Sequence, residues 1–245
     1  MELIGMWRDL TTLGTTWFIY FSAIGILRKL IRKPHPLQPI VFFHNLFLAV
    51  ASLWMFLGIC VALKNTWMEG GLKAIYCPHS IKTSNPLTSS FYSSSIGYWL
   101  YVFYLSKFYE LLDTFILICR GKPLTLLHVW HHASVLLETW AWYSFGLTFA
   151  SLGMLFNTFI HVWMYGYFAA SAIHIRVPWR RWITTMQIIQ FICSFLLSIP
   201  YIYWQWITNA ACGASIPAWI ISVGCNGSYL FLFIRFYTKT YVHTA

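Results

Sequence analysis

The sequence predicts an all-α membrane protein with seven transmembrane helices, and three observations support this prediction. Hydrophobic residues make up 59% of the 245 residues and charged residues only 9%, whereas soluble domains carry about 25% charged residues. Seven stretches are apolar over the roughly 20 residues that a helix needs to cross a bilayer. Connections rich and poor in Lys and Arg alternate along the chain. No Gly/Ser-rich linker or internal repeat divides residues 1–245, so we expect a single transmembrane domain.

The predicted spans follow one another with short connections. They run from Leu10 to Leu27, Pro39 to Leu63, Ile96 to Cys119, Leu124 to Phe145, Leu147 to Ile173, Trp182 to Trp206 and Ile216 to Tyr237. The fourth and fifth spans are so close that Tyr143-Ser144-Phe145-Gly146 is expected to form a tight turn. The first stretch follows no basic segment and lacks an A-x-A cleavage site, so we interpret it as a retained span rather than a signal peptide.

The predicted orientation follows from the basic residues between the spans. One set of connections contains eleven of them: Arg28, Lys29, Arg32, Lys33, Arg120, Lys122, Arg176, Arg180, Arg181, Arg235 and Lys239. The opposite set contains four: Arg8, Lys64, Lys73 and Lys82. Because cytosolic connections are enriched in Lys and Arg, the amino terminus is predicted to be lumenal and the carboxyl terminus cytosolic.

Two cysteines, Cys77 and Cys212, fall in the predicted lumenal connections, where oxidation is permitted. A disulfide between them is one prediction, and two free thiols are the alternative, because spacing alone does not show proximity. The six cysteines are too scattered for a disulfide framework, and no CxxC pair indicates a metal site.

Polar residues gather in four of the predicted spans. Span by span, they are Lys107, Glu110, Asp113 and Thr114; His128, His131, His132 and Glu138; Asn157 and His161; and Thr184, Gln187 and Gln190. Ionisable groups are costly inside a membrane and are functional candidates by default. At 1.5 Å per residue, most of these residues lie roughly 6–18 Å from the cytosolic end of their span. Their common depth predicts one buried site in the cytosolic half.

Some of these residues also have a purely structural interpretation. Lys107 and Glu110 could simply neutralise each other, and Asn157, Gln187 and Gln190 could hold helices together through hydrogen bonds. The three histidines of H-x-x-H-H share one helix face, which is harder to explain as structural support. We expect His44, which stands isolated in its span, not to be catalytic.

The histidines allow two kinds of chemistry. A single metal held by three His ligands stays open, whereas a di-iron oxygenase needs more histidines than these spans offer. A neutral imidazole can instead attack a thioester and form an acyl-imidazole. Burial disfavours the charged imidazolium and so keeps the ring nucleophilic.

Four motifs resemble those of the ELO family of very-long-chain fatty acid elongases, the 3-ketoacyl-CoA synthases of the endoplasmic reticulum. They are Lys107-Phe-Tyr-Glu110-Leu-Leu-Asp113-Thr114, His128-Val-Trp-His131-His132, Asn157-Thr-Phe-Ile-His161-Val-Trp-Met164-Tyr165-Gly-Tyr167 and Thr184-Thr-Met-Gln187-Ile-Ile-Gln190. The resemblance covers nearly the whole chain, and Phe168 departs from it where the family usually has Tyr. It implies an inverted six-helix barrel of two three-helix units around an acyl tunnel, with the first helix peripheral.

The resemblance also implies a reaction, in which long-chain acyl-CoA and malonyl-CoA give 3-ketoacyl-CoA, CO2 and CoA without cofactor or metal. We expect His131 to carry the acyl group, and His161 and Asn157 to donate hydrogen bonds to the enolate oxygen. His128 and His132 complete the expected catalytic group. The residues expected to shape the site are Lys107, Glu110, Asp113, Thr114, Tyr165, Gln187 and Gln190. The residues expected to bind CoA are Arg120, Lys122, Arg176, Arg180 and Arg181.

The expected location is the endoplasmic reticulum membrane. Expected partners are membrane lipid, the two CoA substrates, and the reductases and dehydratase of the elongation cycle; nucleic acid is not expected, and a homodimer is left open. The alternative from another class is a seven-helix membrane carrier that uses the polar layer as its substrate site. Trp99, Trp140 and Trp204, near the lumenal ends, are candidates for limiting the length of the acyl chain.

Overall fold

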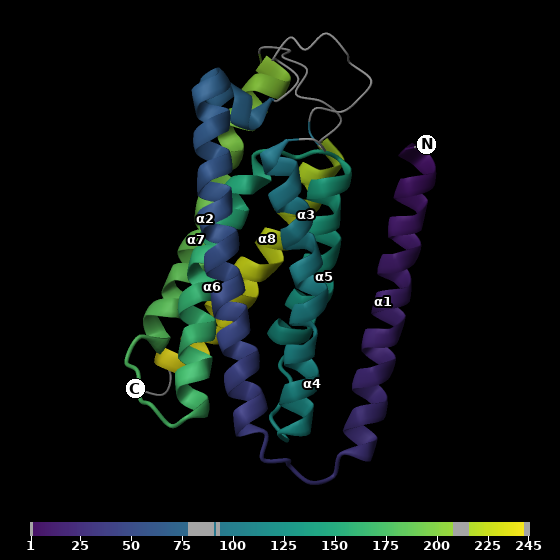
Figure 1. Ribbon diagram of the computed structural model, residues 1–245, viewed down its shortest axis with the longest axis vertical. Coiled ribbons are helices and arrows are strands. Elements are labelled where there is room, and N and C mark those ends of the chain that lie inside the picture. Colours follow the sequence, from purple (N-terminus) through teal and green to yellow (C-terminus); the bar gives the residue numbers. More distant parts are fainter. Residues whose placement is uncertain (1, 78–90, 92–93, 208–215, 243–245) are drawn as a thin grey trace.

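The structure is a computed structural model that describes residues 2–77, 91, 94–207 and 216–242, and within these ranges it is helical without a strand. The helices are α1 (Glu2–Leu30), α2 (Gln38–Tyr76), α3 (Ser95–Glu110), α4 (Leu112–Cys119), α5 (Leu126–Ser144), α6 (Ala150–Ala172), α7 (Arg180–Ile202) and α8 (Ile216–Tyr237), with π-helical turns η2 (Tyr203–Ile207) and η3 (Thr238–Val242). α3 and α4 together cover the third predicted span, so the helices match the seven predicted segments in order (Figure 1). The all-helical prediction is confirmed.

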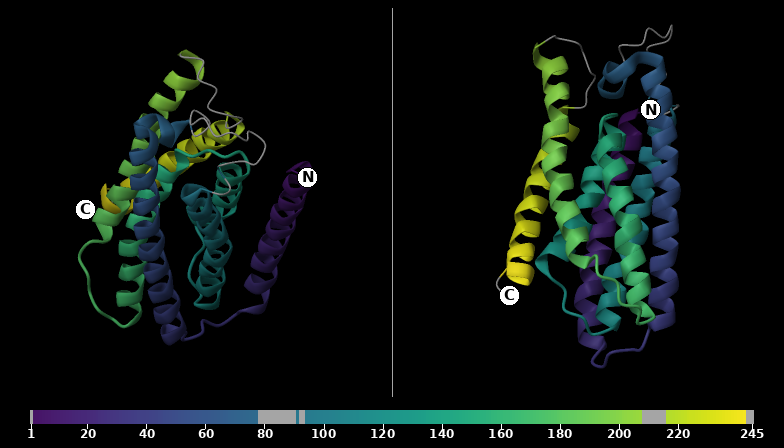
Figure 2. Two further views of the ribbon diagram at one scale, coloured as in Figure 1. Left: turned by 45° about the horizontal axis from the view of Figure 1, so that its top comes forward. Right: turned by 90° about the vertical axis from the view of Figure 1, so that its left-hand side faces the viewer.

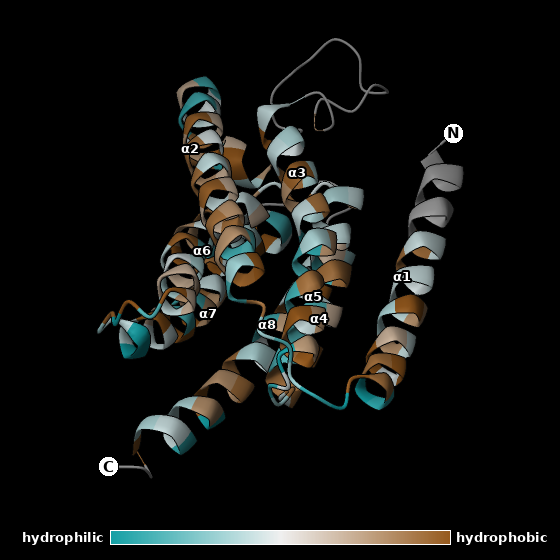
Figure 3. Ribbon diagram, turned by 60° about the horizontal axis from the view of Figure 1, so that its bottom comes forward, coloured by the Kyte–Doolittle hydropathy of each residue, from teal (hydrophilic) through white to brown (hydrophobic). Residues whose placement is uncertain are grey.

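Four helical segments of the described chain are long and apolar enough to cross a membrane: Leu10–Leu30, Gln38–Tyr76, Arg180–Ile207 and Ile216–Val242. They correspond to the first, second, sixth and seventh predicted spans. The helices between them carry most of the predicted polar site, and the third predicted span is divided into α3 with 16 residues and α4 with 8, each too short to cross a membrane alone. In Figure 3 hydrophobic residues run along the helices, whereas the connection between α1 and α2 is hydrophilic. The chain is therefore a membrane protein.

The third predicted span is wrong in one respect, because it is not one continuous helix. The N–H of Leu111 donates to the carbonyl of Phe108 at 3.3 Å, and the N–H of Thr114 donates to the carbonyl of Leu111 at 3.2 Å. Bonds that reach back three residues tighten the helical turn. The tightening falls between Glu110 and Asp113, so these two carboxylates do not keep the angular spacing of an uninterrupted α-helix.

Two other helices depart from the predicted boundaries for identifiable reasons. α2 continues beyond Leu63 to Tyr76 but is kinked at Gly70 and Gly71, and Gly71 has a φ of 63°, which glycine adopts without strain. α7 contains Pro200 and passes into the π-helical turn η2. Proline has no N–H to donate to the preceding turn, which loosens the helix at this end.

The predicted tight turn between the fourth and fifth spans is confirmed. α5 ends at Ser144, and Gly146 has a φ of 64°. The N–H of Gly146 donates to the carbonyl of Tyr143, and the N–H of Leu147 donates to the carbonyl of Trp142 at 2.9 Å. A left-handed glycine after the last turn satisfies helix carbonyls in this way.

After this turn α5 and α6 pack on different neighbours. α6 packs on α2 and α7, whereas α5 packs on α3 and α8. α7 packs on α8, and α2 packs on α3, so each of these six helices has a neighbour on both sides. The right-hand view of Figure 2 shows α7 and α8 side by side along one edge. The space that this arrangement leaves between α5 and α6 becomes important for the site.

α1 lies at the edge of the bundle, beside α4 and α5 (Figures 1 and 2). Its outer face is apolar, and Phe18 is 74% exposed. Its inner face buries Leu13 and Tyr20, and the indole N–H of Trp17 donates to the carbonyl of Ala133 on α5 at 2.9 Å. The peripheral helix is thus anchored to the bundle by one face.

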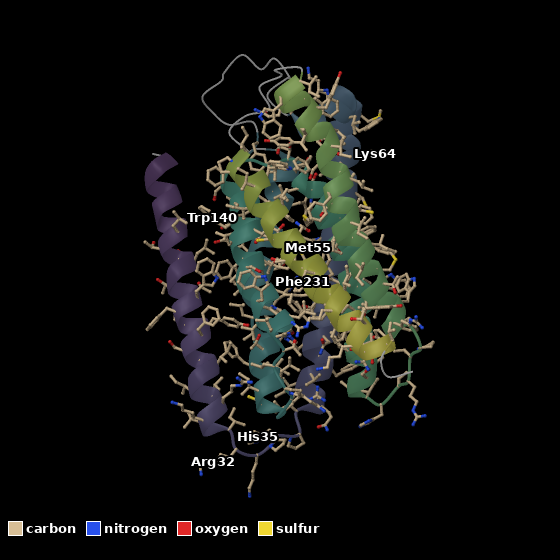
Figure 4. All side chains as sticks on the ribbon, turned by 180° about the vertical axis from the view of Figure 1, so that it is seen from behind. Arg32, His35, Met55, Lys64, Trp140 and Phe231 are labelled. Atoms are coloured by element: carbon tan, nitrogen blue, oxygen red, sulfur yellow. The ribbon has the colours of Figure 1, made fainter. Side chains whose placement is uncertain are left out.

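The basic connections gather at one end of the bundle. Figure 4 labels Arg32 and His35 at this end and Lys64 toward the other. The ends of α4 and α6 and the carboxyl terminus lie at the same end as Arg32 (Figure 1). The alternation of connections that the charge pattern predicts is therefore present, while the compartment that each end faces stays a prediction.

The predicted disulfide falls partly outside the described residues. Cys77 follows the last residue of α2, is buried and is disulfide-bonded. Cys212 lies outside the described ranges, so its pairing with Cys77 stays a prediction.

A close contact between α2 and α3 gives a test of this packing. A Cβ atom at Gly58 would lie within the indole ring of Trp99, which itself packs edge-on against Trp54 at 4.7 Å between ring centres. We expect Gly58→Ala to destabilise the protein by about 1–3 kcal/mol, the usual cost of overpacking. Thermal unfolding in detergent should show a lower midpoint.

Gly14→Ala is the matched control, because no described atom lies within 4 Å of a Cβ at Gly14. Its unfolding midpoint should stay close to that of the wild type. Equal midpoints for Gly58→Ala and Gly14→Ala would contradict the described contact between α2 and α3.

Candidate active site

The main cavity of the bundle has a volume of about 410 Å³, and its wall includes residues of every helix from α2 to α8. Ten of the twelve residues predicted to be catalytic or site-shaping line it. They are Glu110, Asp113, His128, His131, His132, Asn157, His161, Tyr165, Gln187 and Gln190. The structure thus brings into one cavity polar residues that lie far apart in the sequence.

Asp113 of α4 joins three helices through its carboxylate. Its Oδ1 lies 2.7 Å from Nε2 of His44 on α2, and its Oδ2 accepts a hydrogen bond from the hydroxyl of Tyr165 on α6 at 3.0 Å. His132 of α5 is farther away, with its Nε2 4.0 Å from Oδ2. These contacts fix the position of a carboxylate that would otherwise be costly to bury.

Glu110 is paired with Lys107 in the interior. The ammonium of Lys107 donates to Oε1 of Glu110 at 2.7 Å, and both side chains are at most 3% exposed. Lys107 also donates to Oδ1 of Asn157 at 3.4 Å and lies over the ring of Phe103 at 4.0 Å. The predicted neutralisation of Lys107 by Glu110 is therefore present. The same pair also orients the amide of Asn157, which leaves its NH2 group available to the cavity.

The three histidines of α5 lie close together in the wall. The ring centres of His128 and His132 are 4.4 Å apart, and those of His131 and His132 are 5.6 Å apart. The helix begins just before them, where the hydroxyl of Thr125 caps the N–H of His128. An early position on α5 therefore places all three rings at the main cavity.

His161 contributes from α6, across the space between α5 and α6. It is 5% exposed, and its Nδ1 lies 3.9 Å from Oε1 of Glu110. Its ring packs edge-on against Tyr165, at 5.2 Å between ring centres. The divergence of α5 and α6 therefore lets His131 and His161 line one cavity from two helices.

A second, smaller cavity of about 60 Å³ adjoins the first. His131, Asn157, Gln190 and Phe191 line both. Beyond them the wall of the small cavity is mainly apolar, with Phe103, Trp142, Leu147, Phe149 and Phe156 among its residues. The main cavity, with its polar motif residues, and this apolar pocket thus meet at His131.

One polar cluster interrupts the apolar wall of the small cavity. Glu138 of α5 is 2% exposed and accepts a hydrogen bond from the amide of Asn226 on α8 at 2.7 Å. The indole N–H of Trp142 on α5 donates to the hydroxyl of Ser222 on α8. These bonds connect α5 to α8. Asn226 also belongs to an N-x-S glycosylation sequence, and its side-chain contacts show it directed into the bundle.

The predicted CoA-binding residues divide into two groups. Arg120 and Arg180 line the main cavity. Lys122, Arg176 and Arg181 are exposed at the same end of the bundle and are not among the described residues of its wall. The guanidinium of Arg181 donates to the hydroxyl of Tyr237 at 2.9 Å, which connects α7 to α8.

Lys107 and Thr114 are the predicted residues that lie behind the wall. Lys107 supports Glu110 and Asn157, as described above. Thr114 is fully buried, and its hydroxyl lies 2.8 Å from Nε2 of His128 and 2.9 Å from the hydroxyl of Tyr20 on α1. Both residues therefore act on the site through their neighbours.

Sequence reasoning missed several residues of the site. His44 is not isolated, because the tertiary contact with Asp113 brings it to the cavity wall. Tyr20 had no visible signal, since a single Tyr in an apolar span is common at membrane interfaces. Trp99, Trp140 and Trp204 are not among the described residues that line either cavity, whereas Trp142 lines the smaller one. A helical projection of α5 could have shown that Trp142 shares a face with His131, Val135 and Glu138.

The histidines and carboxylates do not gather as a metal site. Within the described ranges, no group of three or more His, Cys, Asp or Glu side chains is arranged to hold a metal ion. The expectation that the reaction needs no metal stays a prediction.

Comparison with known proteins gives consistent matches. A family model described as "ELO: GNS1/SUR4 family" matches residues 6–245. Fatty acid elongase A of Dictyostelium discoideum is 34% identical over 213 residues, which cover 86% of this chain and 74% of that protein. Fatty acid elongase sre1 of the same organism is 32% identical over 231 residues, covering 93% and 82%. Long chain fatty acid elongase 1 of Caenorhabditis elegans is 32% identical over 233 residues, covering 94% and 74%.

The buried ion pair gives a test of how the site is held together. Lys107→Met leaves the carboxylate of Glu110 without its cation, and Glu110→Gln leaves the ammonium without its anion. We expect each change to destabilise the protein by about 3–5 kcal/mol, because an unpaired buried charge is costly. The double variant removes both charges and should unfold at a higher temperature in detergent than either single variant. Additive losses in the double variant would contradict this coupling.

Proposed function

Because the chain belongs to the ELO: GNS1/SUR4 family and is therefore an enzyme of fatty acid elongation, we propose that it condenses a long-chain acyl-CoA with malonyl-CoA. The products are 3-ketoacyl-CoA, CO2 and CoA. One observation supports this most strongly: His131 lies where the main cavity, which contains most of the polar motif residues, meets the smaller apolar pocket. A thioester whose tail occupies the apolar pocket would present its carbonyl carbon to this imidazole.

In the proposed first step, an imidazole nitrogen of His131 attacks the thioester carbonyl carbon. The carbon–sulfur bond breaks, CoA leaves as the thiol with the imidazole proton, and the acyl group stays on the ring nitrogen as an acyl-imidazole. Burial supports this choice because it disfavours the charged imidazolium, which is not nucleophilic. His131 is preferred to His128 and His132 because it alone of the three lines both cavities.

In the proposed second step, malonyl-CoA enters the main cavity and loses its free carboxyl group as CO2. The electron pair of that carbon–carbon bond forms an enolate, whose α-carbon attacks the acyl-imidazole. The carbon–nitrogen bond breaks, the freed ring nitrogen takes up one proton from solvent water, and 3-ketoacyl-CoA leaves with the neutral imidazole of His131 restored. The NH2 group of Asn157 and the ring N–H of His161 are the proposed donors to the enolate oxygen. The bond from Lys107 to Oδ1 of Asn157 supports this assignment, because it directs the NH2 group away from the ion pair.

The remaining polar residues are proposed to hold the site in shape. Asp113 is the acceptor that orients His44 and Tyr165, and Glu110 balances the charge of Lys107. Gln187 lies 3.5 Å from the sulfur of Met164 and contributes, with Gln190, amide groups to the wall. Such pre-oriented groups stabilise developing charge without reorganisation.

The proposed architecture is an inverted barrel of six helices, from α2 to α8 with α3 and α4 as one segment, around an acyl tunnel. The order of packing supports it, since each of these helices contacts a neighbour on both sides. The tunnel would open at the basic end, where Arg120 and Arg180 line the main cavity and could bind CoA phosphates. Lys122, Arg176 and Arg181 would attract the same anion from outside the wall.

The proposed cellular setting follows from the reaction and the charge pattern. The chain would form a single multi-pass domain of the endoplasmic reticulum membrane, with a lumenal amino terminus and a cytosolic carboxyl terminus. It would pass its product to the reductases and dehydratase of the elongation cycle, because a 3-ketoacyl-CoA needs reduction, dehydration and reduction to become a saturated chain. The proposed reaction uses no cofactor or metal beyond the two CoA substrates.

The covalent step can be tested with purified protein in detergent. Incubation with acyl-CoA alone should add one acyl mass to the intact protein, and peptide mapping should place it on His131. His131→Ala should form no adduct and lose at least a thousandfold in ketoacyl-CoA formation, since a nucleophile is difficult to replace. His35→Gln, in an exposed connection, is the control and should behave as the wild type. An intact adduct on His131→Ala would contradict the choice of nucleophile.

The apolar pocket gives a second test. Trp142 lines this pocket and stacks on Phe103 with an angle of 7° between the rings. Trp142→Phe removes volume from the wall while keeping an aromatic ring, so we expect the preferred acyl-CoA to become longer. Trp140→Phe is the matched control, because Trp140 is also buried on α5 but is not among the described residues of the pocket wall. Product analysis with a panel of acyl-CoAs and labelled malonyl-CoA measures both. The same shift in both variants would contradict the assignment of the pocket to the acyl tail.

A further inference from the structure

Three side chains connect the peripheral helix α1 to the histidine cluster. The hydroxyl of Tyr20 on α1 lies 2.9 Å from Oγ1 of Thr114 on α4, and the same Oγ1 lies 2.8 Å from Nε2 of His128 on α5. Tyr20 is 1% exposed and Thr114 is 0% exposed. The hydroxyls of Tyr20 and Thr114 are therefore out of contact with solvent or lipid, and this buried pair bonds to a histidine of the cavity wall.

The directions of these hydrogen bonds follow from counting protons. Tyr20 and Thr114 each have one hydroxyl proton, and a neutral imidazole has one N–H. Among the described residues, Thr114 is the hydrogen-bonding partner of Tyr20, and Tyr20 and His128 are those of the Thr114 side chain. A buried donor without an acceptor costs about 1–3 kcal/mol.

One arrangement gives every hydroxyl proton an acceptor. Tyr20 donates to Thr114, and Thr114 donates to Nε2 of His128. If Nε2 carried the ring proton instead, it would donate to Thr114. Either the hydroxyl proton of Thr114 or that of Tyr20 would then be left without an acceptor. The buried arrangement thus favours the tautomer of His128 in which Nδ1 carries the proton.

We propose that Tyr20 is a positioning residue that holds His128 as an Nδ1–H donor toward the substrate. His128 lines the main cavity, and among the described residues its Nδ1 has no hydrogen-bonding partner. An N–H in this wall would donate to the thioester oxygen as negative charge develops on it, next to the nucleophile His131. The opposite tautomer would present a lone pair to that oxygen and repel it. This inference rests on the proposed condensation and assigns His128 the role of an oxyanion donor within it.

The packing of α1 makes this role specific to Tyr20. Leu13, Trp17 and Tyr20 lie on the inner face of α1, but the indole N–H of Trp17 donates to a backbone carbonyl of α5. Trp17 therefore anchors α1 to the bundle, whereas Tyr20 belongs to the hydrogen-bonded chain Tyr20–Thr114–His128. A fixed second partner is the usual means by which a protein selects a histidine tautomer.

The test combines a spectroscopic and a kinetic measurement on the full chain in detergent. Nitrogen-15 NMR of histidine-labelled protein distinguishes the two tautomers, and the signals of His128 are assigned by their loss in His128→Asn. We expect His128 to be protonated on Nδ1 in the wild type and to become a mixture in Tyr20→Phe. In an assay of ketoacyl-CoA formation, Tyr20→Phe should lower kcat by about tenfold or more and leave KM nearly unchanged, because a histidine in the wrong tautomer is a poor catalyst.

Three further variants separate positioning from general destabilisation. Trp17→Phe removes another hydrogen bond between α1 and α5, and it should change neither the spectrum nor kcat. Thr114→Ser keeps the hydroxyl and should resemble the wild type. Thr114→Val removes the hydroxyl that joins Tyr20 to His128, so it should resemble Tyr20→Phe. A wild-type His128 protonated on Nε2, or a Tyr20→Phe variant with unchanged spectrum and kcat, would overturn the proposal. A wild type that forms no ketoacyl-CoA would refute the proposed condensation, and the nitrogen spectrum would still decide the tautomer of His128.

Discussion

One constraint shapes the structure: a charged group that is buried in the bundle needs an oppositely charged or hydrogen-bonding partner. Lys107 and Glu110 neutralise each other at 2.7 Å, and Asp113 accepts from His44 and Tyr165. An unpaired charge at this depth would cost more free energy than most single contacts contribute. Asp113 takes its partners from α2 and α6, and Lys107 also donates to Asn157 on α6, so these bonds set how α2, α3, α4 and α6 approach one another.

The divergence of α5 and α6 opens a cavity among these hydrogen-bonded polar residues. Only residues 145–149 join these helices, yet α6 packs on α2 and α7 while α5 packs on α3 and α8. The separation leaves a cavity of about 410 Å³ whose wall contains the polar motif residues, with a smaller apolar pocket beside it. Chemistry on a lipid-like substrate needs this combination, because the reacting thioester requires oriented polar groups and its tail requires an apolar surface.

The sequence by itself determined the elements and the polar composition of the site. Hydrophobic runs of membrane-spanning length located each helix, although α1 begins before Leu10 and α2 continues beyond Leu63. The near absence of a connection between the fourth and fifth runs indicated the tight turn, which Gly146 makes in the left-handed region. The spacing of H-x-x-H-H placed its three side chains on a single helix face. Equal depth then indicated that the faces meet, because a membrane fixes the height of each helix and thus restricts the possible partners.

Only the tertiary structure decided which partners those side chains take. The bonds from His44 to Asp113, from Asn226 to Glu138 and from Tyr20 to Thr114 join residues 69, 88 and 94 positions apart. It also divided α3 from α4 and put Trp142, rather than Trp140, in the pocket wall. The physical reason is that hydropathy and spacing describe each helix along its own axis. The rotation of a helix and the identity of its neighbours are set by side-chain packing and hydrogen bonds among all of the helices at once.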